Sequence, residues 1–141
     1  MKRLVIFVTA GMLAALASGS AAFAQSRIAL VIGNTSYAAG PATTAANDAG
    51  LAAQTLQSAG FEVIGARDLN WGNLVRSLND FVDRAEQAGP DTVAFVYLAG
   101  YGVQFEGDNY FLAVDARSGG PIPVPLQAIR HGRLASARLE W

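Results

Sequence analysis

Two uninterrupted apolar runs, each followed closely by glycine, restrict the folds open to this 141-residue chain more than any other feature. The first run covers residues 27–32 and is followed by Gly33; the second covers residues 92–98 and is followed by Gly100. Runs without alternating polar positions are typical of strands buried on both faces. Because such strands occur in parallel sheets that helices cover on both sides, the chain is predicted to be an α/β protein.

Between the two runs, the spacing of apolar residues predicts a helix followed by a strand. Asn47 or Asp48 is expected to cap this helix, which ends at Gly60, and residues 61–64 are expected to form the strand. The predicted inward face of the helix consists of Leu51, Ala52, Thr55, Leu56 and Ala59.

A second helix is predicted from Asp68 or Asn70, as its cap, to a stop near residues 89–90. Its buried stripe consists of Trp71, Leu74, Val75, Leu78, Phe81, Val82 and Ala85. The alternation of strand and helix indicates right-handed crossovers within a parallel sheet. Residues 109–114 are then expected to form a short strand or hairpin arm after a turn at residues 106–108.

The two ends of the chain differ from this pattern. Lys2 and Arg3, an apolar run over residues 4–16 and the Ala22–Phe23–Ala24 triplet predict residues 1–24 to be a signal peptide cleaved after Ala24. The product is expected in the periplasm or outside the cell, with no stable membrane span; a retained anchor is the alternative. Residues 25–116 are predicted to be the folded domain.

Residues 117–141 are predicted to be a divergent tail. Its proline-rich part, residues 119–125, favours extended backbone, and residues 126–139 are expected to include a short helix. The single histidine, His131, lies in this tail, where we interpret it as a surface residue.

Composition excludes several kinds of function. Ten basic and eleven acidic residues give a net charge of -1, which predicts no nucleic-acid partner. The absence of cysteine excludes disulfides, thiolate metal sites and a cysteine nucleophile within these residues, and one histidine cannot form a histidine cluster. We therefore predict neither a metal site nor a cofactor.

Two glycine-containing loops follow the buried strands, at residues 33–37 and 100–104. In parallel α/β sheets, functional residues gather at the carboxyl ends of strands, so these loops are the candidate site. On composition alone, simple tight turns are the favoured interpretation of these loops. The motifs of a phosphate-binding loop and of a serine-hydrolase elbow are absent from the sequence.

Several segments, in consistent order from about residue 27 to 116, resemble the caspase-like domains of bacterial metacaspases and related peptidases of the C14 class. The resemblance is carried by residues 27–37, 46–49, 59–63, 96–104 and 109–116. It implies a three-layer sandwich in which helices cover both faces of a mostly parallel sheet, with strand order 2-1-3-4-5-6. This chain would supply the first half of that fold.

The resemblance also assigns roles to two residues. In the family, the loop after the third strand reads Tyr-x-Ala-Gly-His-Gly, where the histidine is the general base and the next glycine contributes its amide to the oxyanion hole. Tyr101 occupies the histidine position and Gly102 the oxyanion-hole position. A phenol, with a pKa near ~10, is a poor base at neutral pH. The family's cysteine is expected about 50 residues downstream of position 101, beyond Trp141.

These features predict an exported caspase-like protein of the cysteine-type endopeptidase family that is a catalytically inactive pseudopeptidase with a binding or regulatory role. Two alternatives remain: a truncated structural fragment, or an endopeptidase component completed by another chain. The predicted partners are a peptide or protein ligand in the cleft beside Tyr101 and a second copy at the third strand. That strand, residues 93–98, is expected to lie at a sheet edge without charge or proline to protect it.

Overall fold

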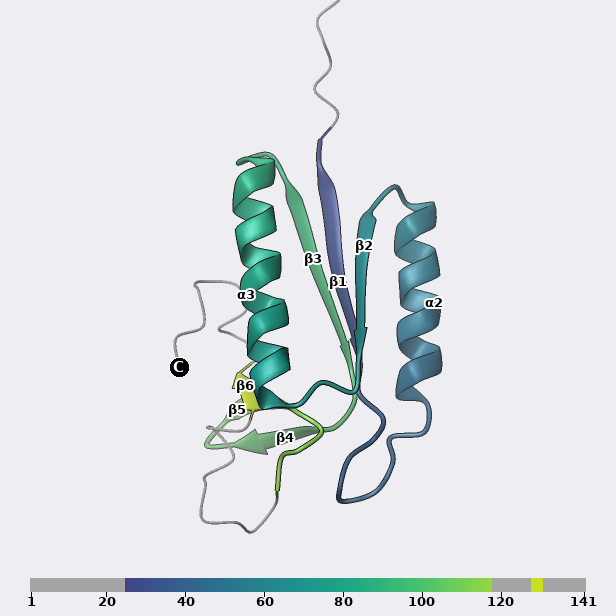
Figure 1. The fold of residues 1–141 in the computed structure, drawn as a ribbon, viewed down its shortest axis with the longest axis vertical. Helices are drawn as coiled ribbons and strands as arrows, with labels where there is room; N and C mark the ends of the chain where they lie inside the picture. The colour runs from purple at the N-terminus through teal and green to yellow at the C-terminus, as the bar shows by residue number, and fades with distance from the viewer. Residues whose placement is uncertain (1–24, 118–127, 131–141) are drawn as a thin grey trace, which may run out of the picture.

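A computed structural model describes residues 25–117 and 128–130 (Figure 1). The predicted signal peptide and His131 lie outside these residues. The elements follow in the order β1 (Arg27–Gly33), α2 (Ala45–Ser58), β2 (Glu62–Arg67), α3 (Trp71–Ala88), β3 (Val93–Ala99), β4 (Gly102–Phe105), β5 (Asp108–Leu112) and β6 (Ala128–Arg130).

The main sheet is parallel and has the strand order β2-β1-β3. Leu30 of β1 lies between Ile64 of β2 and Val96 of β3. Helix α2 lies on one side of this sheet and α3 on the other (Figure 1). The α/β fold and the order of the first three strands are therefore as predicted.

The central strand β1 carries the core on both of its faces. Ile28, Leu30 and Ile32 pack with residues of α3, whereas Val31 packs with residues of α2. Successive side chains of a strand point to opposite faces, so an apolar run without interruption fills two cores at once. The apolar run at residues 27–32 therefore matches a central strand of a parallel sheet with a helix on each face.

Helix α3 packs on the sheet through large side chains at helical spacing, and Leu74, Leu78 and Phe81 are all buried. Asn70 caps the helix, as predicted, because its side chain accepts a hydrogen bond from the Asn73 N–H at 2.9 Å. Asp115, which lies in a turn after β5, accepts a further hydrogen bond from the Trp71 N–H at 2.9 Å. The local cap Asn70 and the distant Asp115 therefore each satisfy one of the first amides of α3.

Helix α2 packs on the opposite face through small side chains. Its buried residues are Ala45 and Ala49. A Cβ placed on Gly33 would lie 2.8 Å from the Ala49 Cβ and 3.0 Å from the Ala45 carbonyl oxygen. The absence of a side chain at position 33 is therefore what allows the start of α2 to approach the end of β1.

Three predictions about helix residues are wrong. Leu51 is 64% exposed, and Thr55 and Ala59, also expected on the inward face, are exposed too, because α2 contacts the sheet mainly through its alanines. Neither Asn47 nor Asp48 caps α2; both lie inside the helix, which begins at Ala45 after an N-cap residue, Thr44, whose side chain makes no capping bond. Asp68 caps no helix either and instead binds the loop after β1.

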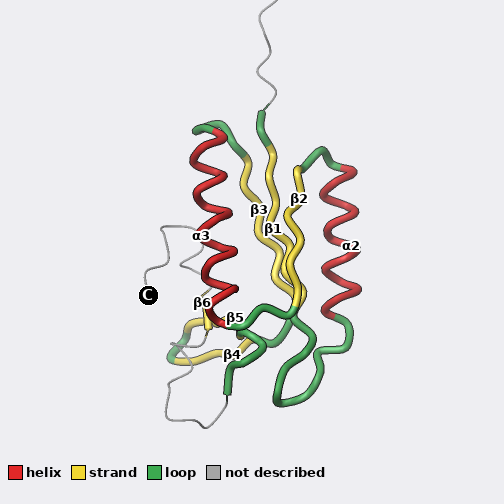
Figure 2. The backbone as a smooth tube through the Cα atoms, viewed as in Figure 1, coloured by secondary structure: helices red, strands yellow, loops and turns green. Residues whose placement is uncertain are grey.

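A second, antiparallel sheet of order β4-β5-β6 lies beyond the carboxyl ends of the parallel strands (Figure 2). Strand β5 confirms the predicted hairpin arm. Strand β4 was not predicted because it has only four residues, and its alternation is limited to Val103 and Phe105. The helix expected within residues 126–139 is wrong where that segment is described, because residues 128–130 form β6, paired with β5.

Candidate functional site

Asn34, directly after β1, connects three segments beneath the candidate site. Its side chain is fully buried; its Nδ2 donates to the Leu112 carbonyl at 3.3 Å and its Oδ1 accepts from the Leu69 N–H at 2.9 Å. Its backbone N–H donates to the Ala99 carbonyl at 2.8 Å. Because a buried amide is costly unless its polar atoms are satisfied, these bonds fix the ends of β1, β3 and β5 relative to one another.

Asp68, after β2, holds the loop that follows β1. Its Oδ1 accepts hydrogen bonds from the Thr35 N–H at 2.7 Å, the Ser36 N–H at 2.9 Å and the Thr35 hydroxyl at 2.9 Å. The Thr35 amide, the Ser36 amide and the two hydroxyls stabilise the carboxylate and lower the pKa of Asp68 to about 2. The residue adopts the left-handed conformation, with φ of 52°.

Tyr37 links the same loop to the residue after β3. Its hydroxyl accepts from the Tyr101 N–H at 3.0 Å and donates to the Leu112 carbonyl at 3.1 Å. Burial raises the pKa of Tyr37, and its hydrogen bond from Tyr101 partly opposes that shift. The hydroxyl therefore stays protonated and keeps both bonds at neutral pH.

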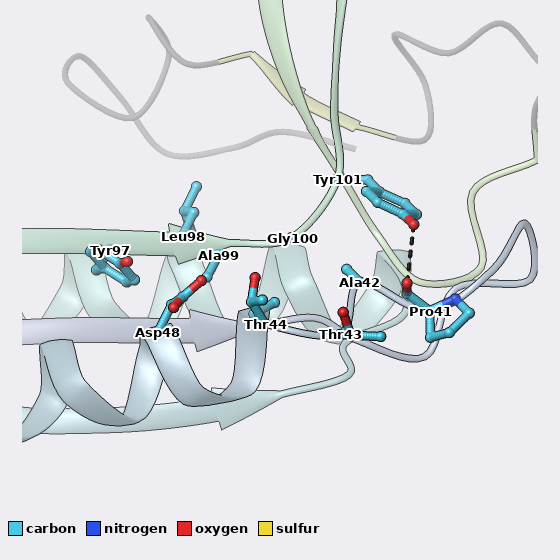
Figure 3. A pocket seen from close by; sticks show the side chains of 11 residues that line it. Pro41, Ala42, Thr43, Thr44, Asp48, Tyr97, Leu98, Ala99, Gly100 and Tyr101 are labelled. Carbon is cyan, nitrogen blue, oxygen red and sulfur yellow. Dashed lines mark hydrogen bonds between the residues drawn. The ribbon is translucent and has the colours of Figure 1, made fainter.

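Tyr101, directly after Gly100, joins the loop after β3 to the loop after β1. Its ring stacks on that of Tyr37, with centroids 4.7 Å apart and planes at 30°. Its hydroxyl donates to the Pro41 carbonyl at 3.1 Å (Figure 3). The side chain is still 39% exposed, so it can contact a ligand while it holds the loop.

The two glycines beside Tyr101 have different roles. A Cβ on Gly100 would collide with the Tyr37 hydroxyl and lie 3.2 Å from the Asn34 Cβ, so this position admits only glycine. Gly102 begins β4 opposite Phe111. The Leu112 N–H donates to the Tyr101 carbonyl, so Tyr101 and Leu112 face each other as a hydrogen-bonded position of the ladder. Because such positions alternate in an antiparallel ladder, the next pair, Gly102 and Phe111, is not hydrogen-bonded. The Gly102 N–H therefore points away from β5.

An open cleft of about 470 Å³ lies between the start of α2 and the end of β3 (Figure 3). Its lining consists of Pro41, Ala42, Thr43, Thr44, Ala45, Asp48, Tyr97, Leu98, Ala99, Gly100 and Tyr101. Tyr101 therefore contributes to the cleft wall, whereas Gly102 is not among the lining residues. Asp48 supplies the single charge in that lining.

The sequence pointed to the loops but missed the residues that join them. These residues are polar and lie just after the ends of β1 and β2: Asn34, Tyr37 and Asp68. Their place after the strand ends was the one feature of the sequence that could have identified them. Within residues 25–117 and 128–130, no three histidine, cysteine, aspartate or glutamate residues are grouped as metal ligands. No helix in this described part is both long and apolar enough to cross a membrane.

A parallel sheet between two helix layers, with a cleft at the carboxyl end of β3, defines a sandwich-type α/β domain. The family model of the caspase domain of peptidase C14 matches residues 26–136, which is most of the chain. The chain therefore belongs to the caspase domain family. It has no significant match among curated proteins.

Proposed function

We propose that this chain is an exported, catalytically inactive member of the caspase domain family that binds an extended peptide in the cleft beside Tyr101. The observation that carries the proposal is the Tyr101 side chain, a phenol at the position that the resemblance assigns to the family's histidine. Its hydroxyl is engaged with the Pro41 carbonyl and its ring with Tyr37.

Inactivity follows from the chemistry that the family position requires. A general base must accept a proton and return it near neutral pH, which imidazole does and a phenol does poorly. The Tyr101 hydroxyl is oriented as a donor toward a carbonyl oxygen, so it has a structural task instead. The 141 residues also contain no cysteine that could act as a nucleophile.

Binding is supported by the character of the cleft. Thr43 and Thr44 line it with hydroxyl-bearing side chains, and Tyr97 and Tyr101 supply aromatic surface. Asp48 is exposed and carries the single charge of the lining, so a basic side chain is favoured over an acidic one. Solvent screening limits this preference to about 1 kcal/mol.

Export is supported by the signal-like pattern of residues 1–24. Fusion of a periplasmic reporter after residue 30, compared with the same fusion carrying Glu at positions 2 and 3, tests it. We expect reporter activity outside the cytoplasm only for the native pattern. Equal cytoplasmic retention of both fusions would contradict export.

Peptide cleavage and peptide binding, measured on the same purified protein, test the remaining proposal. Peptides with one basic or one acidic residue serve as probes, and Tyr101→His and Tyr101→Phe serve as matched variants. We expect no turnover by any of the three proteins and tighter binding of the basic peptide. Turnover by the unaltered protein would overturn inactivity.

The two alternatives from the sequence have distinct outcomes in this assay. Turnover that arises only when a second, cysteine-containing chain is added would identify an endopeptidase component. A folded protein that binds neither peptide would identify a structural fragment.

A further inference from the structure

The main sheet begins immediately after Gln25. The Ser26 carbonyl accepts a hydrogen bond from the Val93 N–H at 2.8 Å, at the amino end of the ladder between β1 and β3. Arg27 then starts β1, and its guanidinium donates to the Ala59 carbonyl at 3.1 Å, where α2 ends. Residues 26 and 27 are therefore both held by segments that are distant in the chain.

Gln25 itself is exposed and lies outside β1. A residue that takes no part in a strand can change its backbone and side-chain geometry without breaking a bond of the ladder. Loss of Ser26, in contrast, would leave the Val93 N–H without its partner. Gln25 can therefore react without disturbing the sheet, whereas the residue after it is part of the sheet's bonding.

The predicted cleavage site directly precedes Gln25. The small-x-small triplet Ala22–Phe23–Ala24 places the cut between Ala24 and Gln25. The exported chain then begins with an exposed glutamine, one residue before the bonding of the sheet begins.

An N-terminal glutamine carries its own electrophile. Its α-amino nitrogen attacks the side-chain amide carbon, the new N–Cδ bond closes a five-membered lactam, and the Cδ–Nε2 bond breaks. The α-amino group gives up a proton to the departing nitrogen, which leaves as ammonia, so the reaction needs no oxidant and no second substrate. Because an α-amine titrates near pH ~8, part of it is neutral and nucleophilic at neutral pH.

The fold is compatible with the lactam at this position. The ring fixes φ of residue 25 as the proline ring does, which is acceptable for a residue that precedes the strand. The reaction also removes the positive charge of the new N-terminus, two residues from the Arg27 guanidinium that binds the end of α2. Since like charges repel, the lactam reduces a repulsion at the start of β1.

We infer that Gln25 is a modification site, at which the exported chain cyclises to an N-terminal pyroglutamate that protects the start of β1. Aminopeptidases recognise a free α-amine, which the lactam lacks. The modification therefore protects Ser26 and the strand after it from stepwise removal. This inference rests on the export part of the proposed function, because cleavage after Ala24 is what makes Gln25 the first residue.

Mass spectrometry of the exported protein tests the modification. The full 141-residue chain is expressed, purified from the exported fraction and kept at neutral pH. We expect the mass of residues 25–141 less one ammonia, a loss of about 17 Da. A synthetic peptide of residues 25–30 is expected to lose ammonia at a rate within about twofold of that of the protein, because Gln25 is exposed.

Gln25→Ser is the matched variant, since it keeps an uncharged polar residue after the cut and has no side-chain amide. We expect this variant to be exported with the full mass of its residues 25–141. An added aminopeptidase is expected to remove residue 25 from the variant and to leave the N-terminus of the original protein intact.

Each outcome separates the inference from the proposed function. An exported protein that keeps a free Gln25 while the peptide cyclises, or that begins at another residue, would overturn the modification and leave export intact. A protein that retains residues 1–24 in the cytoplasm would overturn export itself. Equal trimming of the original protein and Gln25→Ser would show that residue 25 does not protect β1.

Discussion

The two faces of the main sheet are packed by different means. On the α3 face, large side chains such as Leu74, Leu78 and Phe81 fill the space between helix and sheet. On the α2 face, Ala45 and Ala49 bring the helix close to Gly33, and Leu51 is left in solvent. Large buried side chains contribute most to stability, whereas small ones permit close approach.

Because of this difference, one face of the sheet mainly determines the stability of the domain, and the other determines the shape of the cleft. Helix α3 buries the larger apolar side chains, so we expect it to anchor the domain. Helix α2 contributes its first turn to the cleft. That turn lies so close to β1 that there is no room for a side chain on Gly33. We therefore expect substitutions on the α3 face to change stability, and those at the start of α2 to change the shape of the cleft as well.

Leu74→Ala tests the anchoring role of α3 and has the largest expected effect. Leu74 is fully buried, so its truncation is expected to lower the free energy of unfolding by about 3 kcal/mol. Urea denaturation followed by circular dichroism measures this loss. A change below about 1 kcal/mol would show that α3 is not the anchor.

Gly33→Ala tests the close approach of α2. The added methyl group meets the Ala49 Cβ and the Ala45 carbonyl, so a loss of about 2 kcal/mol and weaker peptide binding are expected. The double variant Gly33→Ala with Ala49→Gly removes one of the two contacts. We expect the double variant to lose less free energy of unfolding than the sum of the losses of the two single variants. Losses that are strictly additive would show that the new methyl group at position 33 does not contact Ala49.

Asp68→Asn tests the loop that forms one wall of the cleft. The folded-state pKa of about 2 lies below the ordinary value of 3.8, so the carboxylate contributes stability above pH 3.8 that is lost as the pH falls through about 2. The side chain is 27% exposed, and we expect the variant to lose about 1 kcal/mol at neutral pH.

The pH dependence of unfolding provides the control for this variant. The difference between the original protein and Asp68→Asn is expected to shrink between pH 4 and pH 2, because both side chains are then uncharged. A difference that stays constant across this window would mean that the charge of Asp68 does not hold the loop.

Leu51→Ala has the smallest expected effect. Because Leu51 is mostly exposed, its truncation is expected to change the free energy of unfolding by less than about 0.5 kcal/mol. Leu56→Ala, at a partly buried position on the same helix, is the matched comparison and is expected to cost more. Equal costs for the two leucines would contradict the placement of the α2 face.

Sequence reasoning was most successful where the pattern was strong. Strand β1, helix α3 and the Asn70 cap follow from an apolar run, a seven-residue stripe and a capping residue that are local in the chain. It failed for Leu51 because a helix that packs through alanines leaves a leucine outside, and composition alone favours the leucine as the core residue. Thr44 was missed as the N-cap position because its side chain makes no capping bond.

The sequence by itself determined the family and the parallel α/β architecture, and it predicts that Tyr101 takes the position of the family's histidine, since each depends on residue types in order along the chain. Only the tertiary structure decided what that tyrosine does. Its partners, Tyr37 and Pro41, are 64 and 60 residues away, and parallel strands bring their carboxyl ends together at one edge. Contacts of that range arise from chain crossovers, so no local pattern records them.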